Sequence, residues 1–263
     1  MALRLICAGA AAALVAALPA FAGAPQCRGT VYLTFDTGSQ SQAELIAATL
    51  KRHNAKATFF LANEKTVRGD WSLDPSWAAF WRARVAEGHA FGSHTFDHVY
   101  YVKDGANGEI VVRPQFGGGA GRQASWDAAR FCDEIRRVDA RFMELTGHGL
   151  DPLWRAPGGK TSPRTLAAAR GCGYAHVGWS PAGFSGDELS SARYPNALLL
   201  KQSLAGLGDG DIFMAHMGIW SRKDPWAPAN LEPLLAGLER KGFCFATLRE
   251  HPGYSDKMHK KTN

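Results

Sequence analysis

Two histidines four residues apart, His94 and His98, are the side chains of this sequence best suited to hold a metal ion. Imidazole nitrogens are common zinc ligands, and this spacing lets both rings face one point if the segment forms a helical turn. Two unrelated loop histidines would show the same spacing. Asp97 lies between them in sequence. It either orients a metal-binding imidazole without contacting the metal itself, or faces solvent.

Three further groups have chemistry suited to hydrolysis. Asp36 ends the apolar run Val31–Phe35. A carboxylate there can act as a base towards an activated water, or as the N-cap of a following helix. Arg155 begins an Arg-Ala-Pro-Gly-Gly segment whose backbone N–H groups can meet an oxyanion, although an ordinary strand-to-helix turn has the same composition. His216 follows the apolar run Ile212–Ala215 and titrates near neutral pH, but a single histidine is often structural.

Each of these groups lies at or just beyond the carboxyl end of a predicted β-strand. In a (β/α) barrel the carboxyl ends of the strands share one face, where active sites are built. We therefore expect Asp36, His94, Arg155, Trp179 and His216 to line one pocket. The predicted strands are Thr30–Phe35, Ala57–Leu61, His89–Gly92, Leu153–Arg155, Tyr174–Trp179, Asp211–Ala215 and Phe243–Thr247.

Helical patterns alternate with these strands, which is typical of a parallel α/β fold. Two regions interrupt the alternation. Tyr100–Gly121 reads as a long, glycine-rich and aromatic loop, and Trp220–Pro228 reads as a loop after the sixth strand. The predicted helices lie near Gln40–Asn54, Asp74–Glu87, Ser125–Leu145, Pro163–Arg170, Ala197–Leu207 and Ala229–Lys241.

The amino-terminal residues have the pattern of an export signal. The apolar run Leu5–Leu18 follows a positive charge and precedes the small-x-small sequence Ala20-Phe21-Ala22. The run is too short to cross roughly 30 Å of hydrocarbon as a helix. We expect a signal peptide over residues 1–22, a single catalytic domain over 27–250 and a polar tail over 251–263, with no transmembrane segment after cleavage. The protein is then exported, either periplasmic or secreted.

Composition restricts the possible partners. The apolar content of 46% and eight Trp residues indicate a globular protein, and the formal charge of +6 suits an acidic glycan or the cell envelope. Lys and Arg are scattered without a basic helix or nucleic-acid motif, so no nucleic-acid partner is expected. A merely basic surface explains the charge equally well. Four cysteines follow the predicted signal and allow three disulfide pairings, which the sequence leaves open: Cys27, Cys132, Cys172 and Cys244.

These motifs, in this order, resemble those of the polysaccharide deacetylases, carbohydrate esterase family 4. The resemblance extends over Val31–Leu248. It implies a distorted (β/α)7 barrel of the NodB-homology type. The five matching segments are Thr34-Phe35-Asp36-Thr37-Gly38, His94-Thr95-Phe96-Asp97-His98, Arg155-Ala156-Pro157-Gly158-Gly159, a weak fourth motif at Trp179, and Ile212-Phe213-Met214-Ala215-His216.

The resemblance also implies a role for each residue. Asp36 would be the general base, held by Arg155, and His216 the general acid. The histidines His94 and His98 would be metal ligands. Gly158 N–H would take the oxyanion position, and Trp179 would form a wall of the acetyl pocket. The implied cofactor is a divalent metal, zinc first, with Co²⁺, Ni²⁺ and Mn²⁺ as alternatives.

The chain departs from the family pattern at two places. Thr37 stands where the family usually has an Asp that is the third metal ligand, and a neutral hydroxyl is a poorer ligand than a carboxylate. Thr37 is retained as a candidate ligand. The family's fourth motif usually supplies an Asp that tunes the acid histidine, and here Asp187 is a candidate at a different distance from Trp179.

The implied function is metal-dependent hydrolysis of the N-acetyl group of an N-acetylated glycan. Peptidoglycan or a chitin-like polymer is the expected substrate. Trp220 and Trp226 follow His216 and are expected to contact sugar rings. Two alternatives remain open: a non-catalytic glycan-binding relative, motivated by Thr37, and a deformylase of a lipid-linked amino sugar.

Overall fold

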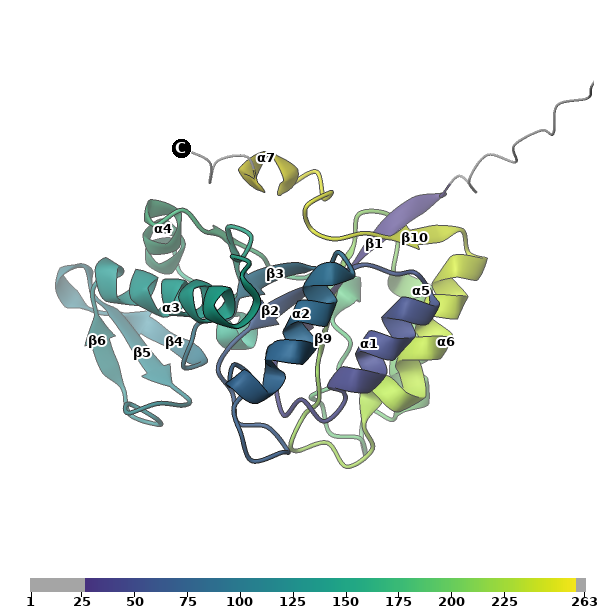
Figure 1. Ribbon diagram of the computed structural model, residues 1–263, viewed down its shortest axis with the longest axis horizontal. Helices are drawn as coiled ribbons and strands as arrows, with labels where there is room; N and C mark the ends of the chain where they lie inside the picture. The colour runs from purple at the N-terminus through teal and green to yellow at the C-terminus, as the bar shows by residue number, and fades with distance from the viewer. Residues whose placement is uncertain (1–26, 259–263) are drawn as a thin grey trace, which may run out of the picture.

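The computed structural model describes residues 27–258, so the predicted signal peptide lies outside the described residues. Parallel strands form a seven-stranded sheet in the order β10-β1-β2-β3-β7-β8, with β9 also paired to β1 (Figure 1). All seven predicted strands are confirmed. Their bounds are β1 Gly29–Asp36, β2 Ala57–Leu61, β3 Ala90–Ser93, β7 Leu153–Trp154, β8 Ala175–His176, β9 Ile212–His216 and β10 Phe243–Phe245.

The sheet curves into a ring through an irregular segment that follows β8. Ser180 N donates to Ile212 O at 3.0 Å, and Ser185 N donates to Met214 O at 3.1 Å. These bonds join residues 180–185 to β9, whose other edge pairs with β1. The fold is thus the expected distorted (β/α)7 barrel in a single domain.

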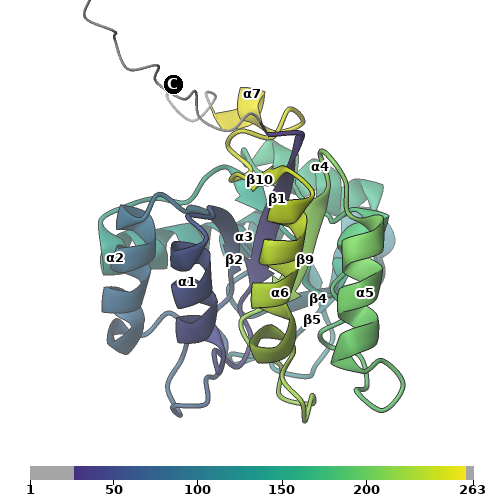
Figure 2. The ribbon, with the colours of Figure 1, turned by 90° about the vertical axis from the view of Figure 1, so that its right-hand side faces the viewer.

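Helices cover the outside of the sheet. Figure 2 shows α1, α2, α5 and α6 standing beside one another in front of β1, β2 and β9. Leu231, Leu234, Leu235 and Leu238 of α6 recur at helical spacing and are all buried in the main core with Leu33 of β1. The helices are α1 Ala43–Arg52, α2 Ala78–Ala86, α3 Ala128–Thr146, α4 Pro163–Gly171, α5 Asn196–Gly206, α6 Trp226–Arg240 and α7 Ser255–Met258.

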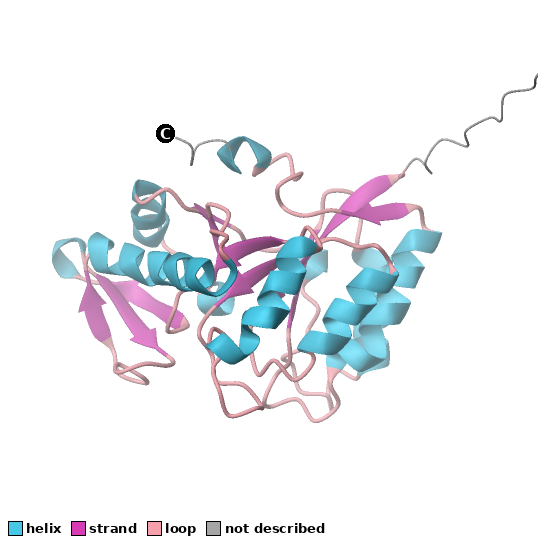
Figure 3. Cartoon of the chain, viewed as in Figure 1, coloured by secondary structure: helices cyan, strands magenta, loops and turns pink. Residues whose placement is uncertain are grey.

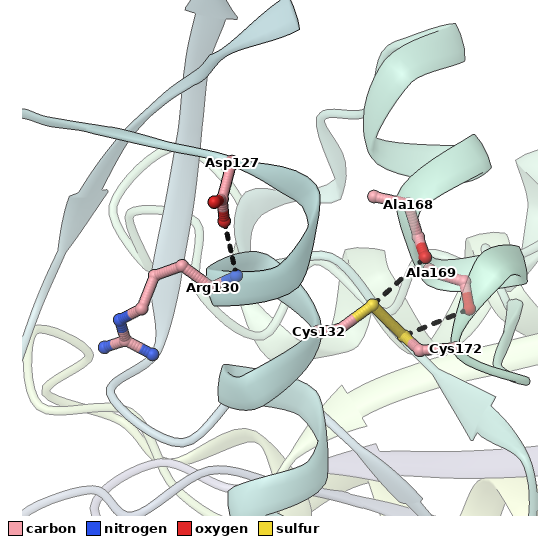
Figure 4. Close-up of a disulfide and its surroundings, with 6 residues drawn as sticks. All are labelled: Asp127, Arg130, Cys132, Ala168, Ala169 and Cys172. Carbon is pink, nitrogen blue, oxygen red and sulfur yellow. Dashed lines mark hydrogen bonds between the residues drawn. A yellow bond between two sulfur atoms is a disulfide. The ribbon is translucent and has the colours of Figure 1, made fainter.

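Local sequence signals set the bounds of α3. The Asp127 side chain accepts a hydrogen bond from Arg130 N at 2.7 Å, which satisfies a free amide in the first turn (Figure 4). Gly147 ends the helix in the left-handed conformation, with φ +78°. The disulfide between Cys132 and Cys172 then ties α3 to the end of α4 (Figure 4).

The second disulfide joins Cys27 to Cys244 and therefore fixes the start of β1 beside β10. Of the three pairings that the sequence allowed, the structure has this one. Each bridge connects segments that are adjacent in space but at least 40 residues apart in the chain.

The prediction of a loop over Tyr100–Gly121 is wrong for much of its length. Three antiparallel strands, β4 Val99–Asp104, β5 Ile110–Pro114 and β6 Ala124–Trp126, form a small sheet beside α3 (Figure 3). Ile110 and Val112 alternate inward and pack with Ile135 of α3. This period-two pattern was present in the sequence, but the surrounding glycines concealed it.

The residues after the barrel also pack on it. Tyr254 lies against the small apolar cluster that contains Tyr32, and His251 contacts the Tyr32 ring edge-on at 4.6 Å. None of the helices within residues 27–258 has the length and apolar content needed to cross a bilayer.

Candidate active site

The carboxyl ends of the barrel strands lie level with one another. Asp36 of β1 is in register with His216 of β9, and Ser93 of β3 is in register with Trp154 of β7. His94 and Arg155 are the next residues along β3 and β7. Because parallel strands keep their ends at one edge, the sequence-predicted residues share a single rim, as expected.

Asp36 is held by a fully buried arginine. The Arg155 Nη1 donates to Asp36 Oδ1 at 2.7 Å and to Thr34 Oγ1 at 2.8 Å. Arg155 Nη2 donates to the backbone oxygen of Gly178, and Nε donates to that of Val177. Burial by itself would raise the pKa of Asp36, but the Arg155 charge, aided by the nearby histidines, outweighs it and lowers the pKa. The carboxylate is therefore ionised at neutral pH.

The His94–His98 segment is a tight turn rather than the helical turn that the spacing suggested. Thr95 and His98 adopt left-handed backbone conformations, with φ +60° and +47°. The Thr95 hydroxyl accepts a hydrogen bond from Val99 N at 2.7 Å, which helps to hold the turn. The two imidazole rings are nonetheless brought together, with centroids 4.9 Å apart. Asp97 does not orient either ring, because it pairs with Arg137 of α3 at 3.1 Å.

The orientation of His94 suits a metal ligand. Its Nδ1 lies 3.0 Å from the backbone oxygen of Arg155, which can only accept, so Nδ1 carries the proton. The Nε2 lone pair is then free and lies 3.7 Å from Asp36 Oδ2. Burial lowers the pKa of His94 to about 3, so the ring is neutral, as metal ligation requires.

His98 shows a complementary feature. It is buried, and its Nδ1 has no hydrogen-bond partner among the described residues. A buried ring nitrogen without a partner is unusual in a folded protein and fits a site that binds something further. The two histidines thus fit half of a divalent metal site. Residues 27–258 contain no group of three or more His, Cys, Asp and Glu side chains already arranged as metal ligands.

Thr37 is buried and its hydroxyl is committed to other groups. It donates to Glu64 Oε1 at 2.7 Å and accepts from Ala62 N at 2.9 Å. Glu64 has only a weak sequence signal, because it is a single acidic residue three positions beyond a predicted strand, and it was not predicted.

His216 has a carboxylate partner from the irregular segment after β8. Asp187 Oδ1 lies 3.0 Å from His216 Nδ1, and Asp187 Oδ2 accepts from His216 N at 2.6 Å. Burial alone would lower the pKa of His216, but the charge and hydrogen bond of Asp187, with Asp36 and Glu188, raise it to about 10. Asp187 therefore hydrogen-bonds to His216, despite its distance from Trp179 in sequence.

Aromatic rings flank the glycine turn that follows Arg155. Gly158 and Gly159 both have positive φ, at +66° and +71°. A side chain at Gly158 would begin 3.1 Å from the Tyr100 ring, and one at Gly159 would begin 2.6 Å from Trp179. The turn can therefore approach both rings only with glycine at these positions. Tyr100 belongs to β4, within the segment that was predicted to be a loop; the aromatic composition of that segment was the sequence signal for it.

The two expected sugar-contacting tryptophans behave differently. Trp220 is 61% exposed in the loop after β9. Trp226 is only 3% exposed and packs on Phe213, with ring centroids 5.6 Å apart, so its assignment to a glycan surface is wrong. Its place in the first turn of α6 directs the ring to the core.

Comparison with known proteins agrees with this geometry. The sequence profile of the polysaccharide deacetylase family matches residues 23–177. The chain is 26% identical over 230 residues to peptidoglycan-N-acetylglucosamine deacetylase PgdA of Listeria monocytogenes, covering 87% of this chain and 39% of that protein. It thus spans about two fifths of that relative. It is 24% identical over 233 residues to the chitooligosaccharide deacetylase of Azorhizobium caulinodans, covering 85% of this chain and 94% of that protein.

A solved structure shows the same fold. The family 4 acetyl xylan esterase from Clostridium thermocellum, in complex with a cobalt ion, superposes with a TM-score of 0.64 at 21% identity. The match covers 86% of this chain and 90% of that one. The fold and the profile match define a carbohydrate esterase of family 4 type. This chain belongs to the polysaccharide deacetylase family.

Proposed function

We propose that this protein is a metal-dependent deacetylase that hydrolyses the N-acetyl group of an N-acetylated glycan, peptidoglycan first and a chitin-like polymer second. One observation carries the proposal. Asp36 and His216 are register neighbours on β1 and β9, and their surroundings move their pKa values in opposite directions. A permanently ionised carboxylate beside a protonated histidine is the arrangement that acid–base hydrolysis requires.

The chain's own residues divide the reaction between them. Asp36, kept ionised and aimed by Arg155, takes the proton of the attacking water. The Gly158 N–H donates to the oxygen that becomes negatively charged on the amide carbon. His216, kept protonated by Asp187, gives its proton to the departing sugar amine. Trp179 and Tyr100 wall the acetyl group and exclude water from it.

His94 and His98 are the residues that would hold the divalent cation, with Thr37 as the third candidate. A bound cation there would polarise the amide carbonyl and make a water more acidic. Zinc suits two imidazoles best, and Co²⁺, Ni²⁺ and Mn²⁺ are the alternatives.

The substrate and compartment rest on independent support. The relatives' printed names include peptidoglycan and chitooligosaccharide deacetylases. Two disulfides are typical of an oxidising compartment, which supports export to the periplasm or beyond. The formal charge of +6 favours association with an anionic cell envelope.

The direct test is acetate release from peptidoglycan, chitooligosaccharides and acetylated xylan, with and without a chelator. We expect release from the N-acetylated substrates, its loss on chelation and its return with Zn²⁺. Enzyme loaded with each cation in turn that releases no acetate from any of these substrates would refute the proposal.

A non-catalytic glycan-binding role is the second candidate, because the neutral Thr37 leaves the histidine pair without the expected carboxylate. That role predicts that the protein sediments with peptidoglycan but releases no acetate and gains nothing from metal.

A further inference from the structure

We propose that Glu64 supplies the anionic ligand of the metal site and that the Thr37 hydroxyl holds it in place for this purpose. The inference rests on the proposed function in so far as that function requires a cation at His94 and His98. It assigns the third ligand to a different strand end: β2 in place of β1.

The backbone places Glu64 beside both parts of the site. Thr37 N donates to Phe60 O at 3.0 Å, which brings position 37 against the end of β2. On the other side, His94 N donates to Leu61 O at 2.7 Å, and Asn63 N donates to Phe96 O at 2.8 Å. The residues just before Glu64 are therefore hydrogen-bonded to the turn that carries both histidines.

The side chain of Glu64 points towards position 37. Its Oε1 lies 2.7 Å from the Thr37 hydroxyl, which occupies the position where the family usually has the side chain of the metal-binding Asp. Because Glu is longer than Asp, a carboxylate that starts on β2 can reach over the short Thr37 side chain.

Glu64 differs from the other buried acidic residues in its surroundings. Glu64 is only 6% exposed, yet no described Lys, Arg or His forms an ion pair with it. Other buried carboxylates in this protein are paired, as Asp36 is with Arg155 and Glu134 with Arg130. Burial of a carboxylate without a counter-charge is unfavourable, and a divalent cation is a group that can compensate it.

The neighbouring residues fix the Glu64 backbone. Ser72 Oγ accepts from Glu64 N at 3.0 Å, and Ser72 N donates to Glu64 O at 2.8 Å. The carboxylate itself accepts one hydrogen bond, from Thr37. The proposal joins Glu64, held by Thr37, to the two imidazoles as a His₂Glu set, a ligand combination that catalytic zinc sites use.

The test measures metal affinity directly, by competition of Zn²⁺ with a chromophoric chelator, and coordination by the visible spectrum of the Co²⁺ protein. Glu64→Gln removes the charge and keeps the shape. Glu144→Gln on the surface of α3 is the matched control. Thr37→Val keeps the Glu64 charge but removes its hydrogen bond. The double variant Thr37→Asp with Glu64→Gln returns a carboxylate to position 37.

We expect Glu64→Gln to weaken Zn²⁺ binding by about 100-fold, with an altered Co²⁺ spectrum, and Thr37→Val to weaken it by about tenfold. The double variant should recover most of the loss, and the control should equal the wild type. If Glu64→Gln binds Zn²⁺ as the wild type does, or if the double variant binds no better than Glu64→Gln, the assignment is wrong.

Circular dichroism of the metal-free proteins separates these outcomes from misfolding, and the recovery in the double variant provides a second check. Acetate release by the wild type is measured in the same samples. Unchanged affinity in Glu64→Gln with active wild type overturns only the ligand assignment. Zn²⁺ binding that depends on Glu64 without any acetate release overturns the proposed function and leaves the ligand assignment standing.

Discussion

Replacement of Asp187 by Asn should remove the charge that keeps His216, the proposed general acid, protonated. The Asp187 carboxylate lies 3.0 Å from His216 Nδ1, and the two side chains are only 4% and 14% exposed. Asn has nearly the same shape and still accepts from the His216 backbone N–H. The substitution therefore removes a charge and leaves the surrounding geometry in place.

The magnitude follows from the pKa of His216. In the wild type the histidine has a pKa of about 10, so it remains protonated throughout the neutral range. Without Asp187, burial lowers the pKa of His216 and only the smaller effects of Asp36 and Glu188 still raise it, so the pKa should fall towards the ordinary value of 6.5. At pH 8 a group with pKa 6.5 is about 3% protonated, so kcat should fall by up to about 30-fold. Activity should recover as the pH is lowered towards 6.

Stability should change with pH in the same variant. The folded pKa of His216 is above its unfolded value, so the pair contributes fully below pH 6.5, and the contribution is lost as the pH rises towards about 10. Breaking a buried pair costs about 3 kcal/mol. Urea unfolding should thus show a gap of about 3 kcal/mol between wild type and variant at pH 6 and a much smaller gap near pH 10.

The assay is the pH profile of kcat for acetate release, with Glu188→Gln as the control for a nearby exposed carboxylate. The control should shift the alkaline limb slightly. An Asp187→Asn enzyme that keeps the wild-type alkaline limb would refute the role of this carboxylate in protonating His216.

Three further results are expected. Asp36→Asn should lower kcat by about 10³-fold or more and also lower the melting temperature, because its buried guanidinium partner loses its counter-charge; retained activity would refute the base assignment. Replacement of both cysteines of the bridge that contains Cys132 should lower the free energy of unfolding by about 4 kcal/mol, measured in urea, since the bridge closes a loop of 40 residues; a change below about 1 kcal/mol would contradict this. Gly159→Ala should destabilise the fold by about 1–2 kcal/mol in thermal unfolding, because its φ is +71° and a side chain would lie 2.6 Å from the Trp179 ring. The control Gly118→Ala lies in open space and should leave the melting temperature unchanged. Equal melting temperatures for the two variants would contradict this prediction.

The main fold could be predicted from sequence because its signals are local. Runs such as Ala57–Leu61 are mostly apolar and buried throughout, as is typical of strands covered on both faces, and the helices carry their apolar residues at helical spacing. The small sheet over Val99–Trp126 was missed because glycine-rich turns separate its short strands. Trp226 was misplaced because sequence order does not tell which way a ring points from the first turn of a helix.

The sequence by itself determined which side chains stand at the strand ends. Asp36, His94, Arg155 and His216 each lie at or just after the carboxyl end of a strand, and parallel pairing brings such residues to one rim independently of the loop conformations. Only the tertiary structure decided their partners. Asp187 and Glu64 lie in irregular segments without periodicity. Their contacts with His216 and Thr37 therefore depend on the path of these segments along the barrel and on the backbone hydrogen bonds that fix this path.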